Sequence, residues 1–282
     1  MKGFGLIILR VLMGTFCTAL ATLPTVSKAA DLQDRPSVYP GLTCLSAPYD
    51  TSGDGAETRI TELISTLRQS IASFPSLQKA LRIRAPDICT YSTTFDARGF
   101  YDPVANLIAL NANMTRGAQL AILIHELRHL DQESVGACPS PNLSMQETAR
   151  AVFALEADAN ATVVLIAHAL RKAGNPGPWE AIQGFPHYKD IADVFLESIE
   201  EINDPGLAMA EAFSQWYEAE WRRERYYIST CSDYLDRQDV EHRLPTYQLL
   251  QPDFLEQLCR MPDGTPYSCS QAATGSIRYP TD

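Results

Sequence analysis

Two histidines four residues apart, His125 and His129, constrain this chain more than any other feature of its sequence. They fall within residues 116–132, where the spacing of apolar residues predicts a helix, and side chains four apart share one helix face. The preceding turn, Ala121–Ile124, is wholly apolar, so we expect this helix to be partly buried. Buried imidazoles cost free energy unless a partner satisfies them. Because neutral imidazole nitrogen suits Zn²⁺, the spacing predicts that both rings bind one metal ion.

The carboxylate of Glu126 follows the first predicted ligand directly, within the sequence His-Glu-Leu-Arg-His. A metal ion lowers the pKa of its bound water to about 7, and a neighbouring carboxylate can take the proton as that water attacks a carbonyl. We therefore predict that Glu126 is the catalytic carboxylate. The alternative is a chance occurrence of the pattern, against which the apolar helical context argues.

A third ligand is required, because a catalytic zinc usually has three protein ligands and one open position. A long helix is predicted shortly after the first one. Ser144 and Glu147 form a capping-box pattern at its start, and Gly174 follows its last predicted residue, Lys172. The second helix is therefore the place to search for the ligand.

Glu156 lies at a core position of that second helix. An unpaired carboxylate among apolar neighbours would be strongly penalised or would protonate, and a metal ion would resolve the conflict. We predict Glu156 as the third ligand, with a buried ion pair to Arg128 or Arg150 as the alternative. The apolar stripe in which Glu156 falls has steps of three and four residues: Ala149, Val152, Glu156, Ala159, Val163, Ile166, Leu170.

Other polar residues of the second helix have weaker claims. Asp158 and His168 lie elsewhere around the helix, so we expect each to face solvent or to serve the structure. Asn160 is one turn from Glu156 on the same face. It could hydrogen-bond a metal-binding histidine, or it could be a simple structural amide.

The order of these motifs resembles known zinc metallopeptidases. A His-Glu-x-x-His helix followed by a helix bearing a glutamate is similar to the gluzincins. The segment Glu156–Ala161 resembles the Glu-x-acid-Ala-Asn pattern of ImmA/IrrE-like metallopeptidases, whose third ligand follows the second histidine by a similar gap. The overall plan is also similar to uncharacterised metallopeptidases exported by proteobacteria, and the resemblance covers roughly residues 95–173.

This resemblance implies a zincin-like core, zinc, peptide-bond hydrolysis and a strand, matched here by Leu107–Leu110, that lines the substrate cleft. The chain departs from the strict zincin pattern by carrying the charged residues Arg128 and Asp131. Gluzincins also have a tyrosine or histidine that stabilises the oxyanion of the transition state. Nothing in the sequence ranks the candidates for that role: Tyr101, His187, Tyr226, Tyr227 and His242.

The first 29 residues predict a secretory signal peptide. Lys2 and Arg10 precede an apolar run over residues 11–23, and small residues precede a cleavage point after Ala29. The alternative is a membrane anchor, but the run is short for a bilayer span. We therefore expect a secreted or periplasmic protein without a stable membrane anchor.

The charge of the chain bears on its partners. The formal net charge is −11, and loss of the three cations of the leader takes it to −14. Such an acidic chain repels phosphate backbones, which excludes nucleic acid as the expected partner. A peptide or protein substrate is the partner that the motifs predict, and the oligomeric state stays open.

Seven cysteines are present, and Cys17 would leave with the leader. An even number in an exported chain suggests three disulfides, with the pairing open. The remaining six are Cys44, Cys89, Cys138, Cys231, Cys259 and Cys269.

The predicted fold class is α+β and mainly helical, with a zincin-like core, a small antiparallel sheet and a C-terminal helical extension. Helices are predicted over residues 57–73, 77–84, 116–132, 144–172, 191–202 and 206–227, with loops at 176–190 and beyond residue 231. The predicted organisation is a signal peptide (1–29), an N-terminal helical segment (30–90), a metallopeptidase core (91–175) and a cysteine-containing helical extension (176–282).

The function that these features favour is zinc-dependent hydrolysis of peptide bonds outside the cytoplasm. A second hypothesis is an exported zinc-containing binding or envelope-structural protein without turnover, against which Glu126 argues because a structural site needs no base. A third is hydrolysis of a non-peptide amide, such as one in peptidoglycan.

Overall fold

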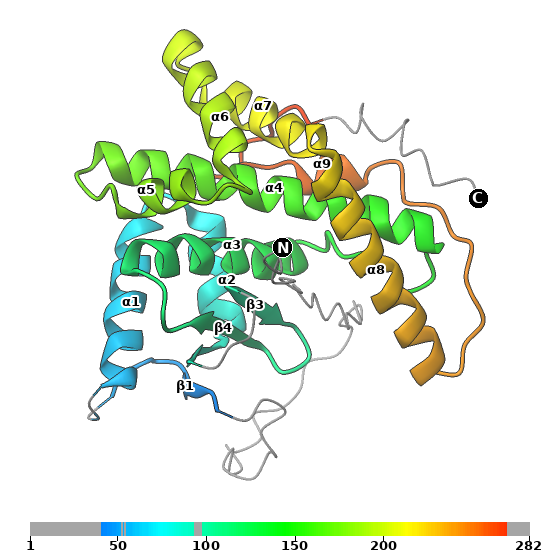
Figure 1. The fold of residues 1–282 in the computed structure, drawn as a ribbon, viewed down its shortest axis with the longest axis horizontal. Coiled ribbons are helices and arrows are strands. Elements are labelled where there is room, and N and C mark those ends of the chain that lie inside the picture. The colour runs from blue at the N-terminus through cyan, green and yellow to red at the C-terminus, as the bar shows by residue number, and fades with distance from the viewer. Residues whose placement is uncertain (1–40, 52, 54, 93–97, 270–282) are drawn as a thin grey trace, which may run out of the picture.

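The computed structural model describes residues 41–51, 53, 55–92 and 98–269. The predicted signal peptide and its cleavage point lie outside these residues. Within them the chain is mainly helical with a small four-stranded sheet, which confirms the predicted α+β class. Figure 1 shows the layers, with the sheet at the bottom, then α3, then α4 and α5, and then α6 and α7.

The sheet is mixed, and the antiparallel meander predicted from sequence is wrong. Its strands are β1 (Thr43–Leu45), β2 (Asp87–Tyr91), β3 (Gly99–Asp102) and β4 (Leu107–Asn111), in the order β1-β2-β4-β3. The strand β4 pairs with β2 in parallel and with β3 in antiparallel orientation. Strand periodicity indicates which face a residue occupies, whereas partner choice depends on distant contacts that periodicity does not encode.

Gly99 allows the edge strand β3 to pack closely against the helix that follows the sheet. A Cβ atom at Gly99 would lie 2.5 Å from Ile122 Cγ2 and 3.0 Å from the carbonyl oxygen of Ala109. Only glycine permits this approach of backbone to helix. The position of β3 beside α3 (Arg116–Ser134) therefore depends on this residue.

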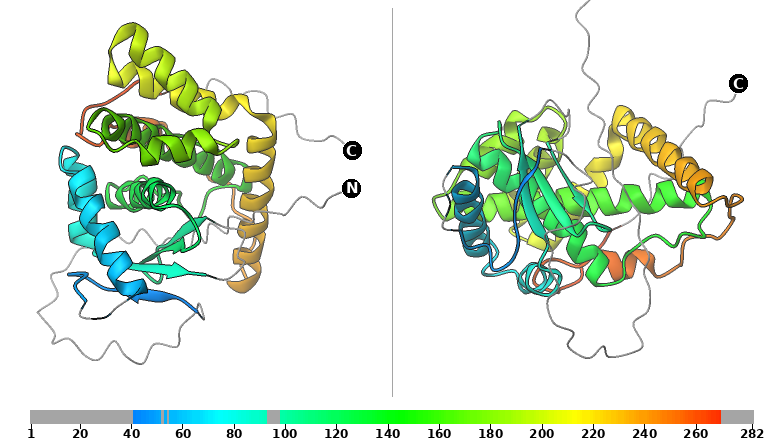
Figure 2. Two further views of the ribbon diagram at one scale, coloured as in Figure 1. Left: turned by 60° about the vertical axis from the view of Figure 1, so that its left-hand side comes forward. Right: turned by 90° about the horizontal axis from the view of Figure 1, so that it is seen from below.

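The helices of the first half follow the predictions closely. These are α1 (Ala56–Ser70), α2 (Pro75–Arg84), α3 and α4 (Met145–Lys172). The Ser144 side chain accepts a hydrogen bond from the backbone N–H of Glu147 at 3.2 Å, as its capping role predicts. Figure 2 shows α3 lying between the sheet and α4, so the two motif helices pack face to face.

The helix α4 is the core of the molecule. It contacts α3, α5, α7 and α8, and its residues are buried on every side over most of its length. By length and composition it could cross a membrane, but 94% of its apolar window is buried inside the fold. Such burial is what a central helix of a globular core shows.

The C-terminal helices depart from the predictions in three places. The region 176–190, predicted as loop, contains α5 (Gly177–Gly184), because a proline at the first turn also starts helices. The predicted helix 206–227 is two helices, α7 (Pro205–Glu218) and α8 (Glu220–Val240), and α8 continues through residues predicted as irregular. The remaining helices are α6 (Lys189–Ile202) and α9 (Phe254–Leu258).

The break between α7 and α8 lies at Ala219, which has an extended backbone. Arginine side chains satisfy the carbonyls that the break exposes at the end of α7. Arg222 donates to the carbonyl of Trp216 at 2.8 Å, and Arg223 donates to that of Tyr217 at 2.6 Å. The residues around the break include neither glycine nor proline, so the sequence carries no local signal for it.

Two disulfides are present among the residues that the structure describes, which include all six cysteines of the predicted mature chain, so the prediction of three is wrong. Cys44–Cys89 joins β1 to β2, and Cys259–Cys269 closes a short loop after α9. Cys138, after α3, and Cys231, on α8, remain thiols. Six cysteines allow at most three disulfides, but their number does not show which thiols lie close enough to bond.

Candidate metal centre

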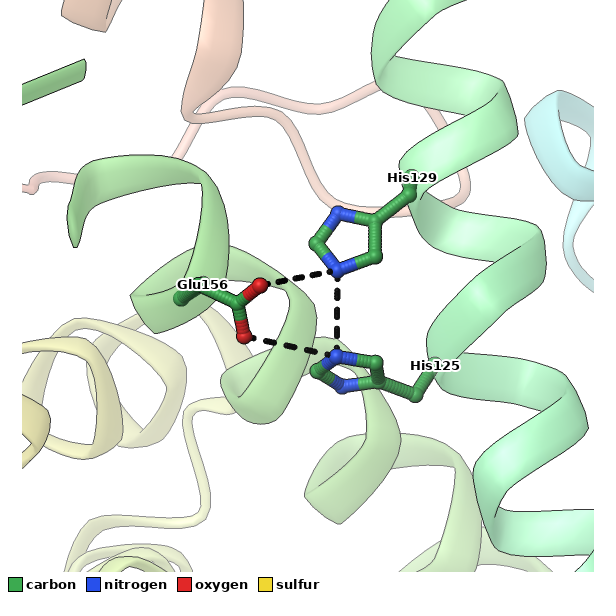
Figure 3. A group of neighbouring side chains, drawn as sticks. All are labelled: His125, His129 and Glu156. Atoms are coloured by element: carbon green, nitrogen blue, oxygen red, sulfur yellow. Dashed lines mark hydrogen bonds and ion pairs between the residues drawn. The ribbon is translucent and has the colours of Figure 1, made fainter. Parts of the chain in front are cut away.

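Three side chains from α3 and α4 meet in the interior. The Nε2 atoms of His125 and His129 are 3.0 Å apart. One carboxylate oxygen of Glu156 lies 3.5 Å from His125 Nε2, and the other lies 3.3 Å from His129 Nε2. Figure 3 shows the two rings and the carboxylate pointing at a common centre. The sequence-predicted trio is therefore together in space.

The separations of these donors suit a small divalent ion. Zinc binds nitrogen and oxygen ligands at about 2.0–2.1 Å, which places neighbouring donors of a tetrahedron about 3.3 Å apart. The measured separations of 3.0–3.5 Å bracket that value. The donor set, two imidazoles and one carboxylate, is also one that zinc prefers. These residues therefore fit a metal ion.

The ion-pair alternative for Glu156 is wrong. Arg128 pairs with Asp131 and Asp158, and Arg150 pairs with Glu147. The Glu156 side chain is fully buried, and its contacts are with the two histidines and one tyrosine hydroxyl. Its position in the apolar stripe of α4 is thus explained by the three-residue centre.

The charges at the centre are strongly coupled. Burial alone would lower the pKa of His129, but the Glu156 carboxylate outweighs burial and raises that pKa to about 9. Burial likewise favours a protonated Glu156, yet the two histidines hold its pKa well below the usual range. Glu156 is therefore ionised, as a metal-binding carboxylate must be.

Glu126 lies beside this centre without belonging to the donor group. Its carboxylate is buried and lies close to the backbone of Tyr101. Burial raises its pKa, and the charges of His125 and His129 oppose that rise. A carboxylate whose pKa moves toward neutrality is suited to exchange protons.

Two strands bear on the predicted cleft. Leu107–Leu110, the strand predicted to line it, forms β4, which is internal, with β2 on one side and β3 on the other. β3 is an edge strand, and the backbone of its Tyr101 lies close to Glu126. That Leu107–Leu110 lines the substrate cleft stays a prediction.

Gln132 fixes the orientation of one imidazole. Its amide nitrogen donates to the carbonyl of Leu155 at 3.0 Å and to Asp158 at 2.6 Å, so its oxygen faces His129. That oxygen lies 2.9 Å from His129 Nδ1 and can only accept. Nδ1 therefore carries a proton, so in the neutral form of the ring, the form that binds a metal ion, Nε2 is the nitrogen with the free lone pair.

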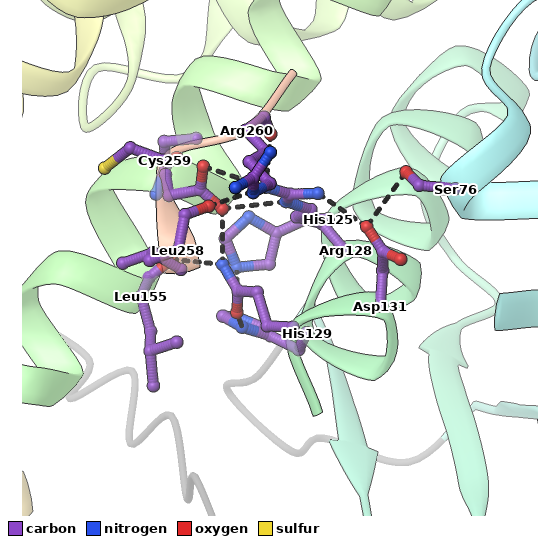
Figure 4. A network of polar contacts seen from close by, with 12 residues as sticks. Ser76, His125, Arg128, His129, Asp131, Leu155, Leu258, Cys259 and Arg260 are labelled. Atoms are coloured by element: carbon purple, nitrogen blue, oxygen red, sulfur yellow. Dashed lines mark hydrogen bonds and ion pairs between the residues drawn. The ribbon is translucent and has the colours of Figure 1, made fainter. Parts of the chain in front are cut away.

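Arg128, the charged residue within the motif, anchors a buried network (Figure 4). Its guanidinium donates to Asp158 at 2.7 Å and to the carbonyl of Arg260 at 2.7 Å. Asp158 also accepts from the Tyr267 hydroxyl at 2.7 Å. Asp131 pairs with Arg128 and accepts from Ser76 at 3.1 Å. The network links the C-terminal segment to α3 and α4.

Sequence reasoning missed this network. It placed Asp158 on a surface or in a structural role, and the residue is fully buried and structural. A signal was present, because Arg128 and Asp131 are charged residues in a helix predicted to be partly buried, and buried charges need partners. Their partner on α4 is 30 positions from Arg128 in sequence, so spacing alone did not identify it.

The other polar residues of α4 serve the structure. Asn160 donates to the backbone carbonyl of Glu156 at 2.8 Å, one helical turn before it, which is the role of a structural amide. The His168 ring packs edge-on against Trp179 and Phe195. Burial and two nearby cations lower the pKa of His168, so its ring stays neutral near pH 7.

One of the five candidate oxyanion donors reaches the centre. The Tyr226 hydroxyl, from α8, donates to Glu156 at 2.9 Å. The Tyr101 hydroxyl instead donates to Glu133 at 2.6 Å, and the His187 ring packs on Trp221. The structure gives Tyr227 and His242 no contact with the three-residue centre. Tyr226 lies on α8, which crosses α4 (Figure 1).

Comparison with known proteins agrees with this geometry. The model of a family described as "Putative metallopeptidase family (DUF6782)" matches residues 29–269. Comparisons with curated proteins and with solved structures give no significant match. The family match spans most of the chain and includes all the residues of the His-His-Glu centre. The protein therefore belongs to the DUF6782 family of metallopeptidases.

Proposed function

We propose that this protein is an exported zinc metallopeptidase, with His125, His129 and Glu156 as metal ligands and Glu126 as the catalytic carboxylate. The observation that carries the proposal is the convergence of the three donors at zinc-compatible separations. Glu126 lies beside them and outside the donor group. The family match supplies the reaction class at a coarse level.

The bound zinc would supply Lewis acidity and lower the pKa of a coordinated water to about 7. The roles of the chain follow from position. Glu126 accepts a proton from the water that attacks the carbonyl carbon and passes it to the leaving nitrogen. The peptide bond then breaks to give a carboxylate and an amine. Tyr226 carries the hydroxyl nearest the ligands and is the candidate donor to the oxyanion.

The competing hypothesis, a binding protein with a structural zinc, is less well supported. Structural zinc sites usually have four protein ligands, whereas catalytic sites have three and keep one position open. In the part of the chain that the structure describes, the candidate group contains three. A buried carboxylate beside the group, with a pKa raised by burial, also has no purpose in a structural site.

Export is supported by the sequence and by the disulfides. Disulfides persist in oxidising compartments, and the chain forms two of them. The amino-terminal leader pattern and the acidic composition agree with a secreted or periplasmic location.

Peptide cleavage that depends on a metal tests this function. Purified protein loaded with one equivalent of zinc should cleave members of a broad peptide library, detected by mass spectrometry. Treatment with a chelator should abolish cleavage, and added zinc should restore it. If the zinc-loaded protein cleaves no peptide but hydrolyses peptidoglycan fragments, the substrate is a non-peptide amide and peptide hydrolysis is wrong.

A further inference from the structure

A cluster of basic side chains lies beside the metal centre of this acidic protein. We call Arg98, His187 and Arg225 the basic rim. The Arg98 guanidinium carbon lies 3.8 Å from the centroid of the Phe185 ring and 5.9 Å from that of Tyr188. The rim thus joins the start of β3 to the connection between α5 and α6.

The rim is adjacent to the centre through two neighbouring residues. On α8, Arg225 lies one helical turn after Trp221, on whose ring His187 packs at 4.7 Å, and next to Tyr226, whose hydroxyl donates to Glu156 at 2.9 Å. Tyr188 directly follows His187. Burial raises the pKa of the Tyr188 hydroxyl, and the charge of Glu156 raises it further while that of Arg98 opposes the rise. The Tyr188 hydroxyl is therefore subject to the charges of both Glu156, in the centre, and Arg98, in the rim.

Three arginines act on the His187 ring. Burial lowers the pKa of His187, and Arg98 and Arg225 lower it further. A third cation, Arg222, acts in the same direction, but it is paired with Asp190 at 2.7 Å. Among the residues that the structure describes, Arg98 and Arg225 form no ion pair with a carboxylate.

Cations without a carboxylate partner are unexpected in a chain with a formal net charge of −11. Arg98 and Arg225 are both half-buried, and stacking on Phe185 holds the Arg98 guanidinium in place. An oriented guanidinium with its hydrogen-bond donors unpaired is a preformed site for a carboxylate.

We propose that the basic rim binds a carboxylate of the substrate, so that this metallopeptidase cleaves acidic peptides in preference to neutral ones. The inference rests on the proposed function and extends it to the substrate class. The carboxylate belongs either to an Asp or Glu side chain near the cleaved bond or to the carboxyl terminus of the peptide. Both sources share the chemistry that the two arginines recognise.

Matched peptide pairs test the preference. Each pair differs by Glu against Gln at one position, and a second set differs by a free against an amidated carboxyl terminus. The zinc-loaded wild type should show a kcat/KM about tenfold or more higher for the acidic member of one set. The set that shows the difference identifies the source of the carboxylate. The preference should shrink as salt rises from low to high concentration.

Variants assign the preference to the rim. The Arg98→Gln, Arg225→Gln double variant should bring the acidic-to-neutral ratio of kcat/KM close to one. Arg98→Glu should reverse the charge preference, so that a peptide with Lys at the responsive position has a higher kcat/KM than the matching peptide with Glu. The Lys79→Gln, Arg82→Gln double variant, on the exposed face of α2, makes the same change in net charge and should leave the wild-type ratio intact.

Binding measured without turnover separates this inference from the proposed function. Fluorescence anisotropy with the zinc-loaded Glu126→Gln variant should show the same acidic preference, and the double rim variant on that background should lose it. If the wild type cleaves peptides but neither assay shows an acidic preference, the rim inference is wrong and the metallopeptidase stands. A preference that persists in the double variant also overturns it. If acidic peptides bind selectively but no peptide is cleaved, the proposed function fails instead.

Discussion

Glu126→Gln should lower the kcat of peptide hydrolysis by at least about 100-fold and leave zinc content at the wild-type level. General-base catalysis typically contributes about 10²–10⁴-fold in rate, and Gln keeps the shape of the side chain while removing its basicity. Since Glu126 is not among the three donors, its loss removes no ligand. The measurement is steady-state kinetics on one cleaved peptide, with metal content determined on the same sample.

The matched control is Glu180→Gln, an exposed glutamate in the first turn of α5. It makes the same chemical change away from the centre and should retain wild-type kcat. Because burial disfavours the charge of Glu126, the neutral Gln should not reduce the free energy of unfolding. A Glu126→Gln variant with wild-type kcat would show that another group transfers the proton.

Arg128→Met should lower the free energy of unfolding by about 3–5 kcal/mol, the usual effect of removing one partner from a buried ion pair. Methionine fills a similar volume but leaves Asp158 and Asp131 buried without their shared cation. It also removes the donors to the carbonyls of Leu258 and Arg260. Urea denaturation, followed by circular dichroism, measures the change.

Lys189→Met is the control for Arg128→Met. Lys189 pairs with Asp193 one helical turn away, and both side chains are about half exposed. Loss of such a pair should cost no more than about 0.5 kcal/mol. Arg128→Met should also weaken zinc binding, because Asp158 holds the amide of Gln132 that orients His129. Equal, small effects of the two substitutions would contradict the structural role assigned to the buried network.

The metal centre could be predicted because each of its parts is local in sequence. His125 and His129 share a face through helical spacing, and Glu156 disturbs an apolar stripe that is otherwise continuous. Bringing the two helices together needs only that both bury their apolar residues. The α4 cap at Ser144 is similarly local, and the structure confirms it.

The parts that sequence did not reveal depend on long-range contacts. Asp158 lies on the side of α4 away from the apolar stripe that contains Glu156, so the stripe alone predicts that Asp158 faces solvent. In the structure α4 is buried on every side. The partner of Asp158, Tyr267, is 109 positions away. The parallel pairing of β2 with β4 and the helix break at Ala219 likewise depend on tertiary packing. Local periodicity carries no information about these contacts.

Zinc content is the decisive measurement for binding of zinc by His125, His129 and Glu156. It is measured by mass spectrometry of the metal after dialysis, on purified wild type, His129→Ala and Glu156→Ala. We expect one zinc per chain in the wild type, none in His129→Ala, and strongly weakened binding in Glu156→Ala, whose apolar replacement suits the buried stripe of α4. Circular dichroism of each variant establishes that it is folded. A folded Glu156→Ala that holds zinc as tightly as the wild type, or a wild type that binds none, would contradict the three-residue metal centre.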